Sequence, residues 1–427
     1  MEKNSIYRVN IIDTNENAVG IAKIDGVVLF VPELVCGDVA EVRITSLKKN
    51  YAIAECVSLI EKSANRIESV CPHAAECGGC TLSHVTYEHE NEIKRNTVRS
   101  ALRRLKLPHD AVCETVFSPS RTRYRNKITL HYSREAGAFG LYREKTNDVI
   151  PFTECLLCSE RVNGVIRFIN ENVHLIRRYS PTSLEVREST DGKITVSLHS
   201  DAMDDELFKD TLCSSFPEVT GVVFVPSAPH AVTERHYVSD SIMGLDLIFS
   251  TDGFRQVNDR AFEKMIEIVT GFAAEREFRT AFDLYCGSGV IGLFLARHFN
   301  DAKFYGIEIN PESIKDAKKN AEQNGITNIE FYCGDAAELR SKLSDAEFPE
   351  LVVVDPPRAG LSDMMRRELL ALYPERIVYV SCNPQTLARD LADITAHGYG
   401  IKRAVPLNMF PMTKHVETIV CLEREDI

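Results

Sequence analysis

Two side chains near the end of the chain have the chemistry of covalent catalysis. Cys382 stands in a Ser-Cys-Asn-Pro stretch directly after the apolar run Ile377–Val380, which predicts a strand. Glu417 stands in a His-Val-Glu-Thr stretch that leads into another apolar run. A thiolate can add to an electron-poor carbon, and a carboxylate can then accept a proton from the adduct. Composition alone would make Cys382 a buried core thiol more often than a nucleophile, and His415 fits a structural role as well as the orientation of a partner.

A glycine-rich stretch earlier in the chain has the spacing of a nucleotide-binding turn. Gly287, Gly289 and Gly292 follow the predicted strand Thr280–Tyr285 and open a helical stretch. Glycines at such a turn let the backbone approach a ligand closely. Glu308, at the end of the next predicted strand, is placed to hydrogen-bond a ribose diol. The spacing alone also fits a dinucleotide-binding dehydrogenase, so it indicates a nucleoside cofactor without identifying it.

Two further acidic positions help to identify which class of enzyme this glycine-rich turn belongs to. Asp335 follows the third predicted strand, Asn328–Tyr332, and is placed to reach an adenine edge. Asp355 opens an Asp-Pro-Pro-Arg stretch after the fourth predicted strand, Leu351–Val354. Ligands of open α/β sheets bind at these carboxyl ends of the strands. Acidic residues at four successive strand ends resemble a class I methyltransferase, and a dehydrogenase would have no use for the catalytic thiol and base.

A cysteine cluster predicts a metal site. The chain has 13 cysteines and no export signal, which argues against a disulfide framework. Cys71, Cys77 and Cys80 have the spacing Cys-x5-Cys-x2-Cys, and Cys155 and Cys158 compete to supply a fourth thiolate. Four thiolates suit an iron–sulfur cluster or zinc, and the sequence does not decide between them. The spacing differs from the Cys-x3-Cys-x2-Cys of radical enzymes.

Three regions would position these residues, and they predict a multidomain fold. Residues 1–62 predict an OB-type β-barrel, with Asp25-Gly26 as a two-residue hairpin turn. Residues 63–257 predict an α+β central domain that holds the cysteine cluster. Residues 258–427 alternate strands and helices, which predicts an α/β, Rossmann-like parallel sheet covered on both faces. The barrel strands are expected at Tyr7–Ile12, Gly20–Ile24, Val27–Val31, Asp38–Ile44 and Tyr51–Leu59.

The charge of the chain is unevenly distributed. The 427 residues carry a net charge of -12, but Lys94–Arg134 contains 11 Lys or Arg against two acids, a net +9, which leaves -21 elsewhere. A basic face of this kind can bind phosphates, although a solvated basic helix and strand explain it equally well. The helix-like part of the segment is Glu92–Leu105. Without a secretory signal or a membrane-spanning apolar run, we expect a cytoplasmic protein with no membrane and no obligate protein partner.

Together these motifs resemble the bacterial RNA 5-methyluridine methyltransferase family, most closely its members that modify 23S ribosomal RNA. The resemblance covers nearly the whole chain, including a TRAM domain in the first 60 residues. It implies Cys382 as nucleophile and Glu417 as general base. S-adenosylmethionine would be bound by Gln256, Tyr285, Gly287, Glu308, Asp335 and Asp355. A [4Fe-4S] cluster, structural or an aid to RNA binding, would be held by Cys71, Cys77, Cys80 and Cys155, the last selected by an asparagine eight residues later.

The implied reaction agrees with the chemistry of the two catalytic residues. Carbon 5 of uridine is a poor nucleophile and cannot attack a sulfonium methyl group unaided. A thiolate that adds to carbon 6 makes carbon 5 nucleophilic, and a base must then remove the carbon 5 proton. The target base must leave its stack to reach Cys382, so the expected partner is a flipped-out loop uridine of 23S ribosomal RNA. Arg125 and Lys127 are expected to hold phosphates.

Two alternatives stay open. The same reaction on transfer RNA is disfavoured because that branch of the family typically lacks the barrel and the cluster. A non-catalytic iron–sulfur RNA-binding protein is disfavoured by the joint presence of Cys382 and Glu417. The chain departs from the family pattern at Asn408, where Asp usually precedes Met-Phe-Pro, and at Arg255, where a second aromatic usually precedes Gln-Val-Asn. These departures concern substrate choice more than reaction type.

Overall fold

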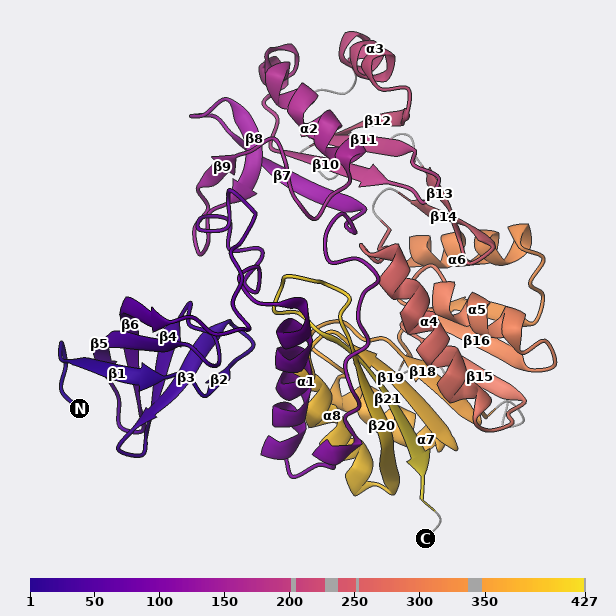
Figure 1. The fold of residues 1–427 in the computed structure, drawn as a ribbon. Helices are drawn as coiled ribbons and strands as arrows, with labels where there is room; N and C mark the ends of the chain where they lie inside the picture. Colours follow the sequence, from indigo (N-terminus) through magenta and orange to yellow (C-terminus); the bar gives the residue numbers. More distant parts are fainter. Residues whose placement is uncertain (201–204, 227–236, 251–252, 337–347, 426–427) are drawn as a thin grey trace.

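Three β-sheets, a β-hairpin and the helices packed on them form the computed structural model of the protein (Figure 1). The structure describes residues 1–200, 205–226, 237–250, 253–336 and 348–425. Within these ranges, no helix combines the length and apolarity needed to cross a membrane.

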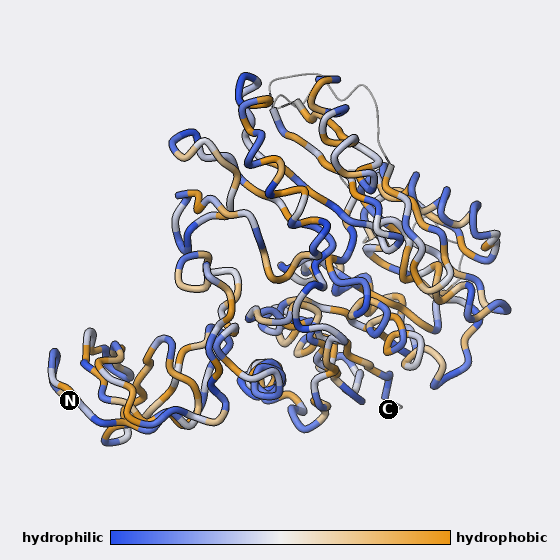
Figure 2. The backbone as a smooth tube through the Cα atoms, turned by 45° about the horizontal axis from the view of Figure 1, so that its top comes forward, coloured by the Kyte–Doolittle hydropathy of each residue, from blue (hydrophilic) through white to orange (hydrophobic). Residues whose placement is uncertain are grey.

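The N-terminal region is a six-stranded sheet with the order β1-β5-β6-β4-β3-β2. Its strands are β1 (Ile6–Asn10), β2 (Asp13–Thr14), β3 (Val19–Ile24), β4 (Val27–Pro32), β5 (Val39–Leu47) and β6 (Tyr51–Glu61). β1 also lies next to β3, so the sheet curls around one apolar core. Buried residues alternate with less buried ones along β3 and β5, and hydrophobic and hydrophilic residues are both present along the backbone of this region (Figure 2). Asp25 (φ 50°) and Gly26 (φ 81°) form the expected hairpin turn, because a two-residue turn of type I′ requires positive φ at both positions.

The central sheet is mixed, with the order β12-β11-β10-β7-β8-β9. Its strands are β7 (Lys127–Ser133), β8 (Ala138–Tyr142), β9 (Val149–Pro151), β10 (Ser183–Glu188), β11 (Ile194–Ser200) and β12 (Val219–Pro226). The helices α2 (Glu160–Glu171) and α3 (Glu206–Ser215) pack on it and share its core. Three short 3-10 helices accompany this part and the segment before it: η1 (His109–Ala111), η2 (Val173–Leu175) and η3 (Arg177–Tyr179).

The C-terminal sheet has seven strands in the order β17-β16-β15-β18-β19-β21-β20. Its strands are β15 (Thr280–Leu284), β16 (Lys303–Glu308), β17 (Ile329–Cys333), β18 (Leu351–Val354), β19 (Arg376–Ser381), β20 (Tyr399–Leu407) and β21 (Glu417–Arg424). The first five run parallel, as the alternation of strands and helices predicts, whereas β21 is antiparallel to both of its neighbours. The order reverses between β15 and β18, and a crevice for ligands is expected at such a switch point.

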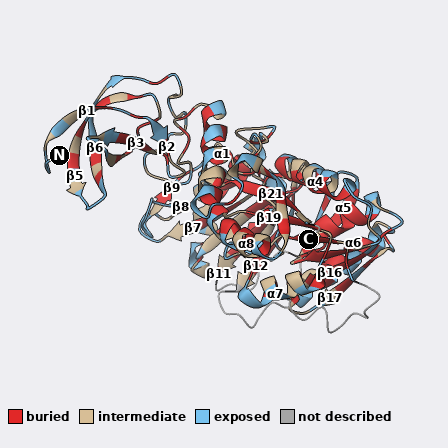
Figure 3. Ribbon diagram, turned by 90° about the horizontal axis from the view of Figure 1, so that it is seen from below, coloured by how far each residue is buried: buried red, intermediate tan, exposed pale blue. Residues whose placement is uncertain are grey.

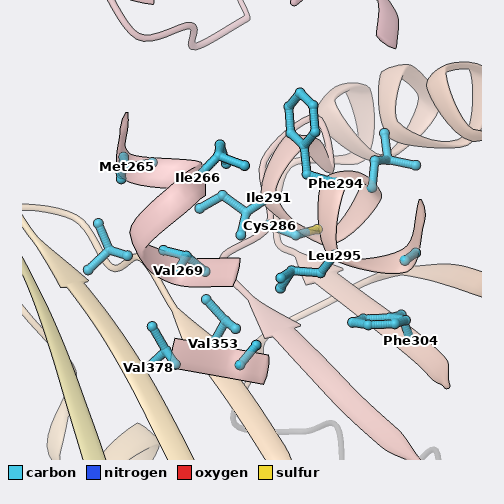
Figure 4. Packing of buried hydrophobic residues seen from close by; sticks show 14 of the residues in the cluster. Met265, Ile266, Val269, Cys286, Ile291, Phe294, Leu295, Phe304, Val353 and Val378 are labelled. Carbon is cyan, nitrogen blue, oxygen red and sulfur yellow. The ribbon is translucent and has the colours of Figure 1, made fainter. Parts of the chain in front are cut away.

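Helices cover both faces of this sheet. They are α4 (Asp259–Ala274), α5 (Val290–His298), α6 (Pro311–Gln323), α7 (Asp363–Leu372) and α8 (Pro384–Ala396). On one face, side chains of α4 and α5 interdigitate with Val353 of β18 and Val378 of β19 (Figure 4). Buried residues are concentrated around β19, β21 and α5 (Figure 3). The carboxyl ends of the strands are therefore set on a rigid base.

The range 63–257 contributes to more than one core. The helix α1 (Tyr87–Arg104) packs on α8 and β20, and its residues Val98 and Leu102 belong to a core of the C-terminal sheet. The hairpin of β13 (Tyr237–Ile242) and β14 (Leu245–Ser250) packs on α6. Helix, hairpin and C-terminal sheet therefore form one packed body (Figure 1).

Candidate active site

The turn after β15 lies at the carboxyl edge of the sheet, where a ligand crevice is expected. Gly287 (φ 54°) and Gly289 (φ 80°) are in the left-handed region. A Cβ on Gly289 would lie 2.6 Å from the ring of Phe331, so glycine is required there for two reasons. The amide of Gly292 donates to Asp283 Oδ2 at 2.8 Å, and burial raises the pKa of Asp283 to about 7. A buried acid therefore holds the start of α5 to the end of β15.

Three predicted cofactor residues, Tyr285, Glu308 and Asp335, lie beside this turn, which itself contains Gly287. Glu308 Oε2 accepts from the amide of Gly287 at 3.3 Å, and Oε1 accepts from the amide of Asn310 at 2.8 Å. Burial, together with nearby carboxylates of which Asp335 has the largest effect, raises the pKa of Tyr285 to about 12. Tyr285, Gly287, Glu308 and Asp335 are thus gathered at one edge of the sheet.

Gln256 lies on a separate loop between β14 and α4. Its carbonyl oxygen accepts from Asn126 Nδ2 at 3.0 Å, and the carbonyl of Val257 accepts from the Asn126 amide at 2.9 Å. Asn258 Nδ2 donates to the carbonyl of Met409 at 2.9 Å. The loop of Gln256 is therefore held against the loop that precedes Glu417. Asn126, which stands between the expected phosphate ligands Arg125 and Lys127, thus positions a neighbouring loop.

Cys382 and Glu417 face each other across neighbouring strands. β19 and β21 are antiparallel, and their last registered pair lies one residue before Cys382 and one residue after Glu417. Burial, then the carboxylates of Glu417 and Asp355, raise the pKa of Cys382 to about 11, and Arg358 opposes them. Burial, with Asp355, holds the pKa of Glu417 well above its usual range. Burial also raises the pKa of Asp355 to about 7. Without substrate, Cys382 is therefore a thiol at neutral pH.

His415 stands beside Arg358. The two side chains are 3.5 Å apart, from Arg358 Nη2 to His415 Nδ1, and the imidazole packs edge-on against Phe410. Burial, followed by the charge of Arg358, lowers the pKa of His415 to about 4, so the ring is neutral at neutral pH. Asn383 Nδ2 donates to the backbone carbonyl of Arg358 at 3.1 Å. Arg358, a positive charge that favours the Cys382 thiolate, thus contacts His415 through its side chain and Asn383 through its backbone.

The predicted metal ligands line one pocket. Its lining includes Cys71, Cys77, Cys80 and Cys155, but Cys158 is not among the lining residues. Asn163 fixes Cys155, because its Oδ1 accepts from the Cys155 amide at 2.8 Å. Burial, followed by the neighbouring thiols, raises the pKa of Cys80 to about 12. In the part of the chain that the structure describes, no three ligating side chains are arranged to hold a single metal ion.

Much of the basic segment is engaged in ion pairs. Lys94 is buried and pairs with an acid on its own helix. Arg95 pairs with Glu114, and Lys127 lies 3.4 Å from Glu185, so both have an acidic partner within the protein. Exposed positive charge remains at Arg103 and Arg104 at the end of α1, and at Lys106 and Arg134. The candidate RNA-binding surface is therefore narrower than the sequence suggests.

Arg255, one of the two departures from the family pattern, is buried. Its guanidinium forms ion pairs with Asp240 and with Asp259, the latter at 2.7 Å, and donates to the carbonyl of Glu188 at 3.2 Å. The arginine therefore joins the central sheet, the β13–β14 hairpin and α4 directly beside Gln256. No single-sequence signal marks these partners.

Comparisons with known proteins agree with this arrangement. The profile of the tRNA (Uracil-5-)-methyltransferases matches residues 86–425, and that of the TRAM domain matches residues 2–57. An uncharacterized RNA methyltransferase of Clostridium acetobutylicum is 34% identical over 455 residues, which cover 100% of this chain and 98% of that protein. Another, of Halalkalibacterium halodurans, is 31% identical and covers 99% and 98%.

Among solved structures, the Pyrococcus abyssi tRNA (uracil-54, C5)-methyltransferase in complex with S-adenosyl-L-homocysteine has the same fold. The TM-score is 0.73 at 23% identity, covering 97% of this chain and 100% of that one. The first profile covers well over half of the chain and the curated relatives cover all or nearly all of it. The chain therefore belongs to the RNA (uracil-5-)-methyltransferase family and begins with a TRAM domain.

Proposed function

We propose that this protein transfers the methyl group of S-adenosylmethionine to carbon 5 of a uridine in 23S ribosomal RNA, through a covalent adduct of Cys382 with carbon 6. The observation that carries the proposal is the register of β19 and β21, which leaves Cys382 opposite Glu417 at the carboxyl edge of the sheet. A nucleophile and a base on one rigid edge can act on adjacent atoms of one ring.

The turn after β15 fits a nucleoside cofactor. A Cβ on Gly287 would meet no atom within 4 Å, so the space in front of the backbone is open. Glu308 would bind the ribose, Asp335 the adenine edge, and the exposed Ile309 (69%) offers an apolar surface beside them. Tyr285 and Gln256 would complete the site. When bound, S-adenosylmethionine supplies an electrophilic methyl group.

The residues of the chain then perform three steps. The Cys382 thiol gives up its proton to solvent, the resulting thiolate adds to carbon 6, and the electrons of the ring double bond move toward the carbonyl at carbon 4. Carbon 5 gains the methyl group, whose bond to sulfur breaks. Glu417 takes the proton from carbon 5, the double bond re-forms, and the sulfur–carbon 6 bond breaks to release the thiolate. Arg358 would favour the thiolate at the start and end of this cycle.

Transfer RNA is the second candidate substrate. The solved Pyrococcus abyssi enzyme is named for transfer RNA and matches over 97% of this chain, so most of the N-terminal sheet is covered. The barrel therefore does not by itself distinguish the two RNA classes. Support for ribosomal RNA comes from the cysteine pocket and from the resemblance of the motifs.

We also propose that the pocket of Cys71, Cys77, Cys80 and Cys155 holds a [4Fe-4S] cluster. The donor set is four thiols in a pocket of largely apolar lining, which suits soft metals. Zinc would require the four sulfurs around one point. A [4Fe-4S] cluster would instead take one thiolate at each of its four irons, and the resemblance of the motifs favours this assignment. Iron, sulfide and zinc analysis of protein purified without oxygen tests this assignment, and zinc without iron would reject it.

The function is tested with labelled S-adenosylmethionine and separated 23S ribosomal and transfer RNA that lack the modification. The wild type should form 5-methyluridine in 23S RNA, and Cys382→Ala should form none. Glu417→Gln should lower turnover by about 10² to 10⁴-fold and accumulate a covalent protein–RNA adduct, because the base acts after methyl transfer. Cys213→Ala, a half-buried thiol on α3, is the matched control. Product only in transfer RNA would move the assignment to the second candidate, and absence of product in both would reject the proposal.

A further inference from the structure

A buried charge network holds the loop that leads to Glu417. Glu90 (0% exposed) and Lys94 (1%) of α1 form an ion pair of 3.2 Å, and both contact the fully buried Asn408. Asn408 Nδ2 donates to Glu90 Oε1 at 2.8 Å, and Asn408 Oδ1 accepts from Lys94 Nζ. Arg121 adds a second positive charge, 3.3 Å from Glu90 Oε2. Charges this deeply buried are stable only when fully paired.

The same residues anchor the backbone of the loop. Residues 408–416 connect β20 to β21, and Leu407 is registered opposite Glu417, so the loop ends at the proposed base. Lys94 Nζ donates to the carbonyl of Phe410 at 2.9 Å. Glu90 Oε1 also accepts from the amide of Met412 at 2.8 Å. Met412 adopts φ 65°, a conformation that a non-glycine residue keeps only when its surroundings enforce it.

Neighbouring elements donate hydrogen bonds to two further carbonyls of this loop. The Tyr124 hydroxyl donates to the carbonyl of Pro411 at 3.1 Å. The amide of Leu82 donates to the carbonyl of Met412 at 2.8 Å. Leu82 stands two residues after Cys80, and the Met412 side chain lines the cysteine pocket. The loop is thus fixed from α1 on one side and from the cysteine segment on the other.

We propose that Glu90, Lys94 and Asn408 are positioning residues, which set the place of Glu417 for removal of the carbon 5 proton; this inference rests on the proposed function. Asn408 is suited to the task because an amide donates to the Glu90 carboxylate and accepts from the Lys94 ammonium at once. Asn408→Asp would put a second carboxylate at 2.8 Å from the carboxylate of Glu90. Two carboxylates so close cannot both stay ionised, and the network must rearrange.

The first readout is turnover and the state of the RNA on denaturing gels. Asn408→Asp should lower turnover by about 10²-fold and accumulate the protein–RNA adduct, as Glu417→Gln does, because a misplaced base stalls the cycle after methyl transfer. The double variant Glu90→Gln with Asn408→Asp restores one carboxylate and one amide, and should recover turnover to within about tenfold of wild type. Asn96→Asp, the same change at an exposed position of α1, is the control.

The second readout is amide hydrogen exchange of residues 408–416, which needs no RNA. Exchange should rise about tenfold in Asn408→Asp and stay unchanged in Asn96→Asp. If Asn408→Asp does not fold, Lys94→Met removes the donor to Asn408 and Phe410 without adding a charge, and carries the same expectations. A loss of turnover without adduct, unchanged exchange in the loop, or no recovery in the double variant would overturn the inference. A wild type without product would reject the proposed function, and loop exchange would still decide whether the network holds the loop.

Discussion

Replacing Arg255 by phenylalanine, which would bring back the second aromatic of the family pattern, should destabilise this protein. The guanidinium is 3% exposed, its partner Asp240 is 0% exposed, and Asp259 is 19% exposed. Removing one member of a buried ion pair typically costs about 3 to 5 kcal/mol, because the partner remains buried and uncompensated. At roughly 2 to 4 °C per kcal/mol for a unit of this size, the melting temperature should fall by on the order of 10 °C.

Calorimetric melting of wild type, Arg255→Phe and an exposed control, Arg260→Phe on α4, measures this effect. Adding Asp240→Asn to Arg255→Phe should recover at least half of the lost melting temperature, because it removes the buried Asp240 charge that Arg255 no longer pairs. Thr190 can still donate to the remaining side-chain oxygen at position 240. If Arg255→Phe melts at the temperature of the control variant, or if Asp240→Asn brings no recovery, the ion pairs of Arg255 do not supply the stability expected of them.

Two further predictions concern the cofactor turn and the catalytic thiol. Gly289→Ala should abolish cofactor binding measured by calorimetric titration, because the new Cβ would lie 2.6 Å from Phe331 on a backbone at φ 80°. Burial and carboxylates raise the pKa of Cys382 to about 11, and a raised pKa means less thiolate at a given pH. Glu417→Gln removes a like charge and should move the pH profile of Cys382 alkylation, followed by peptide mass spectrometry, to lower pH. Arg358→Gln removes the opposing charge and should move it to higher pH; equal profiles in both variants would show that burial alone sets this pKa.

The features that the sequence predicts well are those determined by neighbouring residues. Asp25-Gly26 predicts a turn because both positions need positive φ, and all five expected barrel strands are present, with β2 in addition. The alternation after residue 258 predicts the five parallel strands of the C-terminal sheet. Because carboxyl ends of parallel strands share an edge, the clustering of Glu308 and Asp335 follows from strand order alone.

The features that it does not predict depend on contacts between distant segments. Lys94 counts as one more positive charge in a basic segment, and nothing local shows that it is buried against Asn408. The docking of α1 on the C-terminal sheet joins residues 318 positions apart, as in the bond between Asn408 and Glu90. Short spacing identifies only the first three cysteines of the pocket; Cys155 is expected from the resemblance, and it lines the pocket as expected. In each case the partner is chosen by tertiary packing.

The docking of α1 also has a consequence for the order of folding. This helix is synthesised well before β20 and β21, the strands against which its apolar and charged face is buried. Until then Glu90 and Lys94 lack their partner, and Val98 and Leu102 have no core to enter. Closing a loop of this length is slow. The apolar face of α1 stays exposed during that time, which favours transient association with other chains. Completion of the catalytic edge and burial of α1 should therefore be one late, cooperative event.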